Sequence, residues 1–431
     1  MSKRLLEGLT LGDGQFLPLA EIDAYLGRAP QEYPGLGELR LDMELAGIRK
    51  MAYLLLTHGE RLKKAQAGGC IIMAKYPANP SDIYYGSGVI PVDPFVASMA
   101  QIIFRADYSL ASEGRERLSP EACAWQAAGN AAIRRGILPL DSYGVYMGPW
   151  CTNSPYNGED LVDVVPHMHF VDQPFFPHRR GKGENALKRM VGEIRAFVES
   201  MEQLTGKKVS EDDLAREVRT HNRLRGKIRQ LMDYLLLEHP PLGALDTILA
   251  MLLSDDWQGD PVAAENVLDT ILIEAEDRVQ RGVRAPGVPD DAMRIFFAGI
   301  TTCDIRVYNL IEDLGGTLAG LECVWNIFRF YLALAQRDLS IPFAQPMGQR
   351  ASLVAELAGQ MKADGSIFDT AFGCNYISKT ARCVTDAIRR EVEIPTVIID
   401  TDLPGENRQA LEEQLEGFLE IVREAKDSRT G

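Results

Sequence analysis

The sequence lacks the long apolar runs and the basic surface that membrane and nucleic-acid proteins need. No stretch of about 18 apolar residues occurs, so no membrane-spanning helix is expected. Lys and Arg number 46 against 61 Asp and Glu, and the formal net charge of −15 disfavours a phosphate-backbone partner. The N-terminal segment is interrupted by polar and glycine residues at 12–14 and has no secretion signal. We therefore expect a cytoplasmic protein that binds neither a membrane nor nucleic acid.

The motifs of the commonest α/β enzymes are also missing. No G-x-x-x-x-G-K-[ST] loop occurs, so the chain is not expected to bind ATP through a Walker motif. No G-x-G-x-x-G follows an expected strand, and no G-x-S-x-G nucleophile elbow is present. The sequence therefore gives no support to nucleotide-dependent or serine-hydrolase chemistry of these types.

The number of cysteines is odd, which does not suit a framework of disulfides. The seven cysteines are irregularly spaced, and without an export signal they are expected to stay reduced. Core thiols, a catalytic thiol or metal ligands remain as interpretations. Zinc fits less well, because no C-x-x-C pair and no histidine pair at zinc-helix spacing occurs. His167 and His169 flank Met168 and are expected to belong to the edge of a strand.

Short apolar runs alternate with helical patterns in the second half of the chain. This alternation predicts βαβ units and a four-stranded parallel sheet. The expected strands are Arg294–Ile300, Thr317–Cys323, Ser366–Phe372 and Thr396–Asp400, and a charged amphipathic helix is expected at about 407–426.

Earlier apolar runs predict a second α/β lobe, with strands at Gly69–Ala74, Gly88–Val92 and Tyr143–Met147. The region between the lobes is helical and charged, with a helix start at Ser210, and residues 37–66 are expected to form one long helix. We therefore predict an α/β protein whose two lobes are joined by a helical segment. The expected parts are an N-terminal helical segment (1–66), a first α/β lobe (67–180), a helical connecting region (181–290) and a second α/β lobe (291–431).

Side chains that can bind metals follow the expected strands of the second lobe. Ligands of an open parallel sheet bind outside the carboxyl ends of its strands, so these side chains are expected to share one edge. The alternative is that each thiol is a core residue, because cysteine is often buried. The residues at this edge are Cys303, Asp304, Glu322, Cys323, Cys374, Asp400 and Asp402.

The first lobe contributes three more cysteines. Cys151 lies in a stretch rich in Gly, Pro, Asn and Ser, which predicts a loop where a thiolate can be reached. Cys70 falls in an expected strand and Cys123 in an expected helix, so their own surroundings indicate core thiols.

The last part of the sequence holds a distinctive set of motifs, and further motifs precede it. With them, the chain from about residue 60 onward resembles the 2-hydroxyacyl-CoA dehydratase and benzoyl-CoA reductase family, whose subunits contain iron–sulfur clusters. The motifs are Asp364–Ile367 (DGSI), Gly373–Asn375 (GCN), Ile394–Asp402 (IPTVIIDTD) and Glu416–Glu420 (EGFLE), preceded by Phe175–Phe176, Leu204–Gly206, His221–Arg223, Glu312–Gly316 and Glu322–Cys323.

The resemblance implies both a fold and a cofactor site. Subunits of that family have two flavodoxin-like lobes with parallel sheets, and three cysteines hold a [4Fe-4S] cluster. Carried over residue by residue, these ligands fall on Cys123, Cys151 and Cys374, so Cys151 and Cys374 are expected to meet between the lobes. A double-cubane cluster is an alternative, which the remaining cysteines leave open: Cys70, Cys303, Cys323 and Cys383.

The resemblance also implies partners. Such proteins act as two homologous subunits, with a separate ATP-hydrolysing iron–sulfur activator that injects a low-potential electron, a ferredoxin upstream and an acyl-CoA substrate. The missing ATP motifs of this chain agree with that division of labour.

Within the family, the sequence favours a benzoyl-CoA reductase subunit. Such an oxidoreductase passes low-potential electrons to an aromatic acyl-CoA ring in anaerobic aromatic degradation. Thr152 stands where dehydratase subunits often have Asp after the second cysteine, and the N-terminal extension is long. The alternatives are a subunit of a 2-hydroxyacyl-CoA dehydratase, which is a lyase, and a double-cubane electron-transfer protein without a substrate site.

Overall fold

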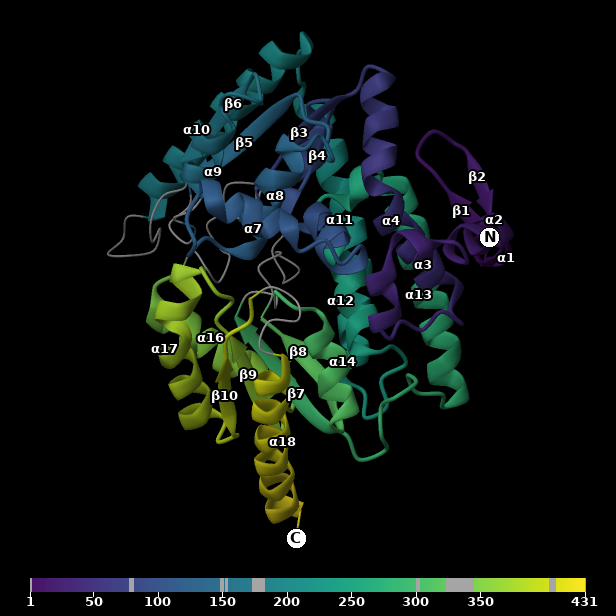
Figure 1. Cartoon of the computed structure of the whole chain (residues 1–431), viewed down its shortest axis with the longest axis vertical. Helices are drawn as coiled ribbons and strands as arrows, with labels where there is room; N and C mark the ends of the chain where they lie inside the picture. The colour runs from purple at the N-terminus through teal and green to yellow at the C-terminus, as the bar shows by residue number, and fades with distance from the viewer. Residues whose placement is uncertain are drawn as a thin grey trace.

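Two four-stranded parallel sheets form the framework of the chain, which confirms the predicted pair of α/β lobes (Figure 1). The computed structural model describes residues 2–76, 81–147, 151, 154–172, 183–299, 303–322, 345–402 and 408–430. In Figure 1 the first sheet lies above the second, and a group of long helices flanks them on one side.

The second sheet matches the prediction closely. Its strands lie in the order β10-β9-β7-β8 and every pair is parallel. Their apolar side chains are buried, as a sheet covered by helices requires. The strands are β7 (Met293–Gly299), β8 (Gly316–Leu321), β9 (Gly365–Asp369) and β10 (Thr396–Ile399), and the helices are α14 (Arg306–Asp313), α16 (Met347–Gln360), α17 (Asn375–Glu391) and α18 (Arg408–Thr430).

The first sheet contains the three expected strands and one that the apolar pattern did not predict. Its order is β4-β3-β5-β6. The added strand, β6 (Met168–Asp172), lies at the sheet edge and is only partly buried, so it has no continuous apolar run. His169 lies in this edge strand, as expected. The other strands are β3 (Ile71–Ala74), β4 (Val89–Val92) and β5 (Ser142–Met147), with helices α5 (Ser81–Gly86), α6 (Pro94–Met99), η2 (Ala100–Phe104), α7 (Ser109–Arg117), α8 (Ala124–Arg134) and α9 (Ser154–Leu161).

Both sheets have the same strand order relative to the chain. In each, the first and third strands are neighbours, the second lies outside the first, and the fourth lies outside the third. This arrangement is that of a doubly wound, flavodoxin-like sheet. Connections leave the two central strands in opposite directions, so the carboxyl ends of β3 and β5, and of β7 and β9, are the places where a ligand is expected.

The helices between the lobes begin and end largely as their sequence requires. Ser210 caps α11: its hydroxyl accepts the Asp213 N–H at 3.1 Å, and the Asp213 carboxylate accepts the Ser210 N–H at 3.2 Å. This capping box confirms the predicted helix start. The elements here are α10 (Gly183–Thr205), α11 (Glu211–Asp233), η4 (Tyr234–Leu236), α12 (Ala244–Leu252), η5 (Trp257–Gly259) and α13 (Pro261–Arg281).

The long helix predicted over residues 37–66 starts later in the structure than the sequence indicated. Helix α4 spans Ala46–Ala67, because the segment before it forms a 3-10 helix and a turn that polar contacts hold in place. The Asp42 carboxylate pairs with Arg278, and the Asp42 N–H donates to Asp246 at 3.2 Å. A short hairpin that was not predicted also occurs here. The N-terminal elements are α1 (Ser2–Glu7), β1 (Gly8–Thr10), β2 (Phe16–Pro18), α2 (Leu19–Leu26), α3 (Ala29–Glu32) and η1 (Pro34–Glu38).

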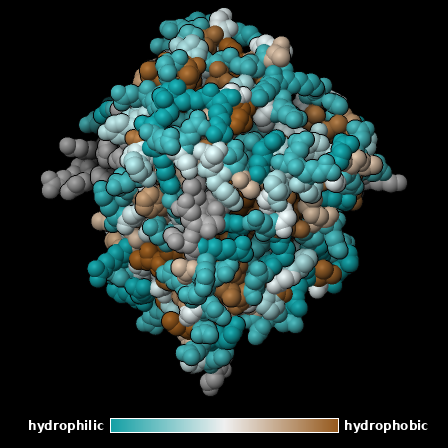
Figure 2. Space-filling view, viewed as in Figure 1, coloured by the Kyte–Doolittle hydropathy of each residue, from teal (hydrophilic) through white to brown (hydrophobic). Residues whose placement is uncertain are grey.

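A continuous apolar core connects the two lobes. It includes Ile72 and Val92 of the first sheet and Ile295, Leu318 and Ile367 of the second. Most of the surface visible in Figure 2 is hydrophilic, with apolar side chains in small scattered groups. Among the described residues, no helix has both the length and the apolar character to cross a membrane.

Candidate functional site

Two of the three predicted ligand cysteines cap helices. Cys123 is the N-cap of α8 and Cys374 is the N-cap of α17. Neither side chain makes a capping hydrogen bond, but the nearby backbone amides of Trp125 and Gln126 lower the pKa of Cys123, and the amide of Ile377 acts in the same direction on Cys374. A helix N-terminus has free amide donors and partial positive charge, so it favours a thiolate at both positions, although burial outweighs this effect at Cys374.

The third predicted ligand lies in a loop, as expected. Cys151 is partly buried between β5 and α9, and its sulfur accepts a hydrogen bond from Gln126 Nε2 at 2.9 Å. The hydroxyl of Tyr76, the second residue after β3, also hydrogen-bonds to this sulfur. The two groups that meet here thus follow the central strands β3 and β5 of the first sheet.

The three thiols lie near enough for their charges to affect the pKa values of Cys374 and Tyr76. Burial and, after it, the charges of Cys123 and Cys151 raise the pKa of Cys374 to about 12, although the Ile377 amide acts to lower it. Burial likewise raises the pKa of Tyr76 well above its ordinary value, and the three cysteines add to that rise. Thiols from two lobes, far apart in the sequence, therefore lie near one buried hydroxyl.

The turn before Cys374 rests directly on the backbone of Cys123. Gly373 has φ +81°, and a Cβ there would lie 2.5 Å from the Cys123 nitrogen and 2.6 Å from the Glu121 carbonyl oxygen. No side chain fits in that space, so glycine is required both for its conformation and for the contact. The two ligand-bearing segments are thus in backbone contact.

An ion pair ties the same segments together from the outside. Arg115, at the end of α7, donates to the Asp402 carboxylate with two guanidinium nitrogens, at 2.9 and 2.5 Å. Its Nε donates to the Ala122 carbonyl oxygen at 2.8 Å, and the guanidinium lies 5.3 Å from the ring centre of Phe372. The apolar and βαβ patterns of the sequence singled out Asp402 but gave no signal for Arg115.

Cys303 is beside the predicted ligands rather than among them. Its thiol hydrogen-bonds to Cys123; this bond, followed by the α8 amides, holds the pKa of Cys123 low against the effect of burial. The same bond and burial raise the pKa of Cys303 well above its usual range, so Cys303 is the donor. Its N–H donates to Thr401 Oγ1 at 3.0 Å, and the Thr401 hydroxyl donates to Asp369 at 2.6 Å. Loops after β7, β9 and β10 therefore converge at the expected sheet edge.

The remaining cysteines lie elsewhere. Cys70 was expected in the core, but it is exposed in the turn before β3, because the strand starts one residue later. Cys383 is in the interior of α17 and is partly buried. Cys323 is outside the described residues.

Buried charges hold the end of β3, next to Tyr76. Lys75 donates to Asp255 at 2.9 Å, and both side chains are almost inaccessible to solvent. Burial, and then the charge of Asp255, raises the pKa of Asp93 well above its ordinary value, which favours the neutral carboxyl. A neutral carboxyl and the lysine reduce the cost of burying charge at this strand end.

The three thiols are a suitable donor set for a cubane. Within the described ranges, no three Cys, His, Asp or Glu side chains approach closely enough to hold a single metal ion. In an iron–sulfur cubane each thiolate binds a different iron, so the ligands lie farther apart than around one ion. Soft thiolate ligands with backbone amide donors suit iron–sulfur chemistry. These three thiols are the residues that would hold such a cluster.

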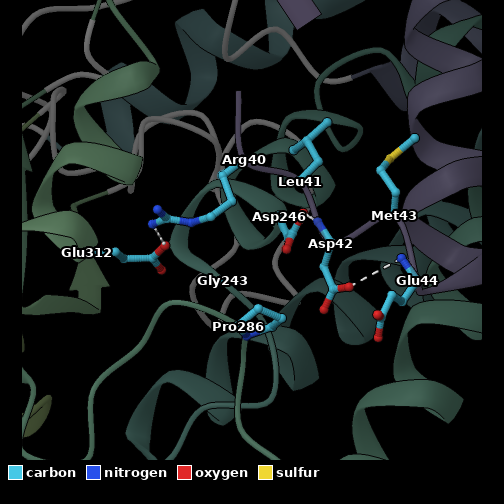
Figure 3. A pocket seen from close by; sticks show the side chains of 9 residues that line it. All are labelled: Arg40, Leu41, Asp42, Met43, Glu44, Gly243, Asp246, Pro286 and Glu312. Atoms are coloured by element: carbon cyan, nitrogen blue, oxygen red, sulfur yellow. Dashed lines mark hydrogen bonds and ion pairs between the residues drawn. The ribbon is translucent and has the colours of Figure 1, made fainter. Parts of the chain in front are cut away.

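A separate cavity of about 420 Å³ lies away from the cysteines, between the segment before α4, α12 and the end of α14 (Figure 3). Helix α14 leads from the loop that contains Cys303 to Glu312 in the cavity wall, so the cavity flanks the opposite end of that helix. Glu312 pairs with Arg40 at 2.8 Å. Burial raises the pKa of Asp246 in the same wall to about 7.

Two comparisons with known proteins found matches to the chain. The family model described as 2-hydroxyglutaryl-CoA dehydratase, D-component, matches residues 78–422. This range contains Cys123, Cys151 and Cys374. The chain is also 24% identical over 319 residues to a protein of Escherichia coli strain K12 named "Putative dehydratase subunit YjiM", a match that covers 67% of this chain and 81% of that protein.

Proposed function

Because the chain belongs to the family of 2-hydroxyglutaryl-CoA dehydratase D-components, we propose that it is a subunit of a 2-hydroxyacyl-CoA dehydratase system and holds one [4Fe-4S] cluster on Cys123, Cys151 and Cys374. The observation that supports the cluster most is that the Cys151 sulfur meets the buried Tyr76 hydroxyl, whose pKa the charges of Cys374 and Cys123 also raise, while the turn before Cys374 packs on the Cys123 backbone. Chance burial of core thiols would leave them apart.

The protein's own residues prepare the site for a cluster. The Cys303 thiol and the α8 amides favour a thiolate at Cys123, the α17 amides partly offset the effect of burial at Cys374, and Gly373 allows the two segments to touch. The partly buried positions limit access of water. When bound, the cluster would supply one-electron chemistry at low potential toward an acyl-CoA thioester.

The family match favours the dehydratase interpretation over the benzoyl-CoA reductase that the sequence first suggested. Thr152, which with the long N-terminal extension was the basis of that suggestion, lies outside the described residues. We therefore propose lyase rather than oxidoreductase chemistry for the complete system. The name of the family model describes one component of an enzyme, so we also propose a homologous second subunit and a separate ATP-hydrolysing activator.

Iron content tests the cluster. Anaerobically purified Cys151→Ala and Cys374→Ala variants should each lose most of their iron, because each removes one of three ligands. Cys70→Ala is the matched control, since Cys70 is exposed and away from the site, and it should keep its iron. Full iron and an unchanged cluster spectrum in both ligand variants would refute the proposal.

Turnover tests the reaction. The complex of this chain, its second subunit and its activator should dehydrate a 2-hydroxyacyl-CoA thioester when ATP and a reductant are supplied. Reduction of benzoyl-CoA without any dehydration would contradict the dehydratase assignment.

A double-cubane electron-transfer protein is the second candidate, and the proximity of Cys303 to Cys123 favours it. The iron count separates the two, because a single cubane gives about four iron per chain and a double cubane about eight.

A further inference from the structure

The three proposed ligand sulfurs differ in the source of their hydrogen bonds. Cys123 accepts from the Cys303 thiol and lies near the first backbone amides of α8, and Cys374 lies near those of α17. Cys151 receives two side-chain donors that are not thiols, the Gln126 amide and the Tyr76 hydroxyl. These two donors can be removed by substitution, so at this sulfur the chain can adjust the site without changing its backbone or losing a thiol.

The Gln126 amide is fixed in the orientation that donates to the sulfur. Gln126 is 4% exposed, and its Oε1 accepts a hydrogen bond from Asn157 Nδ2 at 2.8 Å. With the oxygen bound in this way, Nε2 points to Cys151 at 2.9 Å. A flipped amide would set two NH₂ groups against each other and an oxygen against the sulfur, which are both unfavourable contacts.

The Tyr76 hydroxyl is fixed by packing. Tyr76 is 4% exposed, and its ring meets Phe95 edge to face, with ring centres 5.7 Å apart. Because Lys75, the preceding residue, is anchored to Asp255, the backbone of this segment is held as well. A phenol is a hydrogen-bond donor at neutral pH, so it donates to a thiolate.

We propose that Gln126 and Tyr76 are positioning residues that raise the reduction potential of the cluster by donating to the Cys151 sulfur, an inference that rests on the proposed function. Reduction adds negative charge that the ligand sulfurs share. Donors to such a sulfur therefore stabilise the reduced state more than the oxidised state, and their burial strengthens the effect. Without them the cluster should be harder to reduce.

Redox titration of the full chain tests this inference. The variants are Gln126→Leu and Tyr76→Phe, each lacking one donor. Tyr85→Phe is the control, since it removes a buried hydroxyl that donates to the Asp256 carbonyl oxygen at 2.7 Å rather than to sulfur. With iron retained, each donor variant should lower the equilibrium constant for one-electron reduction about tenfold, which is about 59 mV in midpoint potential. Tyr85→Phe should leave the potential unchanged.

The outcomes distinguish this inference from the proposed function. Iron-loaded donor variants with the same potential as the Tyr85→Phe control would overturn the inference alone. A wild-type chain that binds no iron would overturn both proposals.

A second variant and a second measurement keep the inference testable if Gln126→Leu does not fold or bind iron. If Gln126→Leu loads poorly, Gln126→Glu keeps the size of the side chain and an oxygen for Asn157, and it should show the same downward shift. In wild type, hyperfine spectroscopy in H₂O and D₂O should detect exchangeable protons coupled to the reduced cluster. Persistence of every such coupling in the Gln126 variant would also overturn the inference.

Discussion

Gly373 lies where the two lobes touch, and its missing side chain makes the contact possible. Alanine at this position should cost about 1–2 kcal/mol for its left-handed conformation alone. The added Cβ would also push the turn away from the Cys123 backbone, so we expect Gly373→Ala to lose iron as well as stability. Urea unfolding and iron analysis measure the two effects.

Gly136→Ala is the matched control for this prediction. Gly136 also has a positive φ, +66°, but a Cβ there would meet no atom within 4 Å. It should lose stability by the conformational cost and keep its iron. Equal iron content in the two alanine variants would show that the contact does not hold the site together.

Asp246 should make the stability of the fold depend on pH. Burial raises its pKa from 3.8 to about 7, so between these pH values the folded chain keeps a proton that the unfolded chain has lost. Stability from this group is present below about pH 4 and declines as the pH rises to about 7. Asp246→Asn cannot titrate but can still accept the Asp42 N–H, so its stability should decline less over this window.

Urea unfolding of both proteins at about pH 5 and pH 8 checks this expectation. The gap between variant and wild type should widen toward the higher pH, by on the order of 1 kcal/mol per unit of pKa difference. A gap that is the same at both pH values would contradict the role of Asp246.

At the residue scale, the sequence identified candidate ligand cysteines better than it predicted how buried each cysteine is. Turn residues around Cys151 and the strand before Cys374 indicated positions just beyond strand ends, and the structure places both residues there, partly buried. Cys123 became a candidate only through resemblance, because an N-cap cysteine and a core cysteine look alike in a helical pattern. The prediction for Cys70 was wrong, because a strand boundary one residue away decides whether it faces the core.

Elements of the second lobe are joined by a buried ion pair. Arg350 of α16 donates to Glu322, the residue after β8, at 2.7 and 2.9 Å, and both side chains are fully buried. Gly299 at the end of β7 also donates its N–H to Glu322 at 3.0 Å. The pair therefore connects two strand ends to a helix.

Removal of one partner should be costly. Glu322→Leu leaves the Arg350 charge buried without compensation, so we expect a loss of roughly 3–5 kcal/mol in the free energy of unfolding. The exposed pair Arg408–Glu412 offers a control, and Glu412→Leu should cost less than about 1 kcal/mol. Similar losses in the two variants, measured by urea unfolding, would contradict this view of the buried pair.

At the element scale, buried strands were predictable and partly exposed ones were not. The runs that became β7 to β10 are apolar on both faces, so period and length identified them. The edge strand β6 mixes polar and apolar residues, and the start of α4 is set by contacts with α12 and α13. Such tertiary contacts leave no local pattern in the sequence.

At the scale of the whole molecule, Arg115 and Asp402 join the lobes near the cysteines. Because the pair is partly buried, we expect a coupling energy of about 1 kcal/mol in a double-mutant cycle of Arg115→Met and Asp402→Leu. Hydrogen exchange of the Phe372–Cys374 amides should also become faster in each single variant. Unchanged exchange at this turn would show that the pair does not restrain it.

The shared strand order of the two sheets could be inferred only in part. The sequence predicted parallel sheets, but the order of strands depends on which strands pair across long separations, and local patterns do not encode that. In the structure, Cys151 follows the third strand of its sheet and Cys374 follows the third strand of the other. The two residues thus occupy equivalent positions in the two lobes.

Because Cys151 and Cys374 belong to different lobes, the proposed cluster would also stabilise the fold. A cluster bound to Cys151 and Cys374 is a covalent cross-link between two distant points of the chain, and it would close a very large loop. By analogy with a disulfide that closes a long loop, such a link removes conformational entropy from the unfolded chain and stabilises the fold by roughly 5 kcal/mol. Loss of the cluster to oxygen would then also loosen the junction of the lobes, so an inactivated subunit would become the more easily unfolded and degraded one.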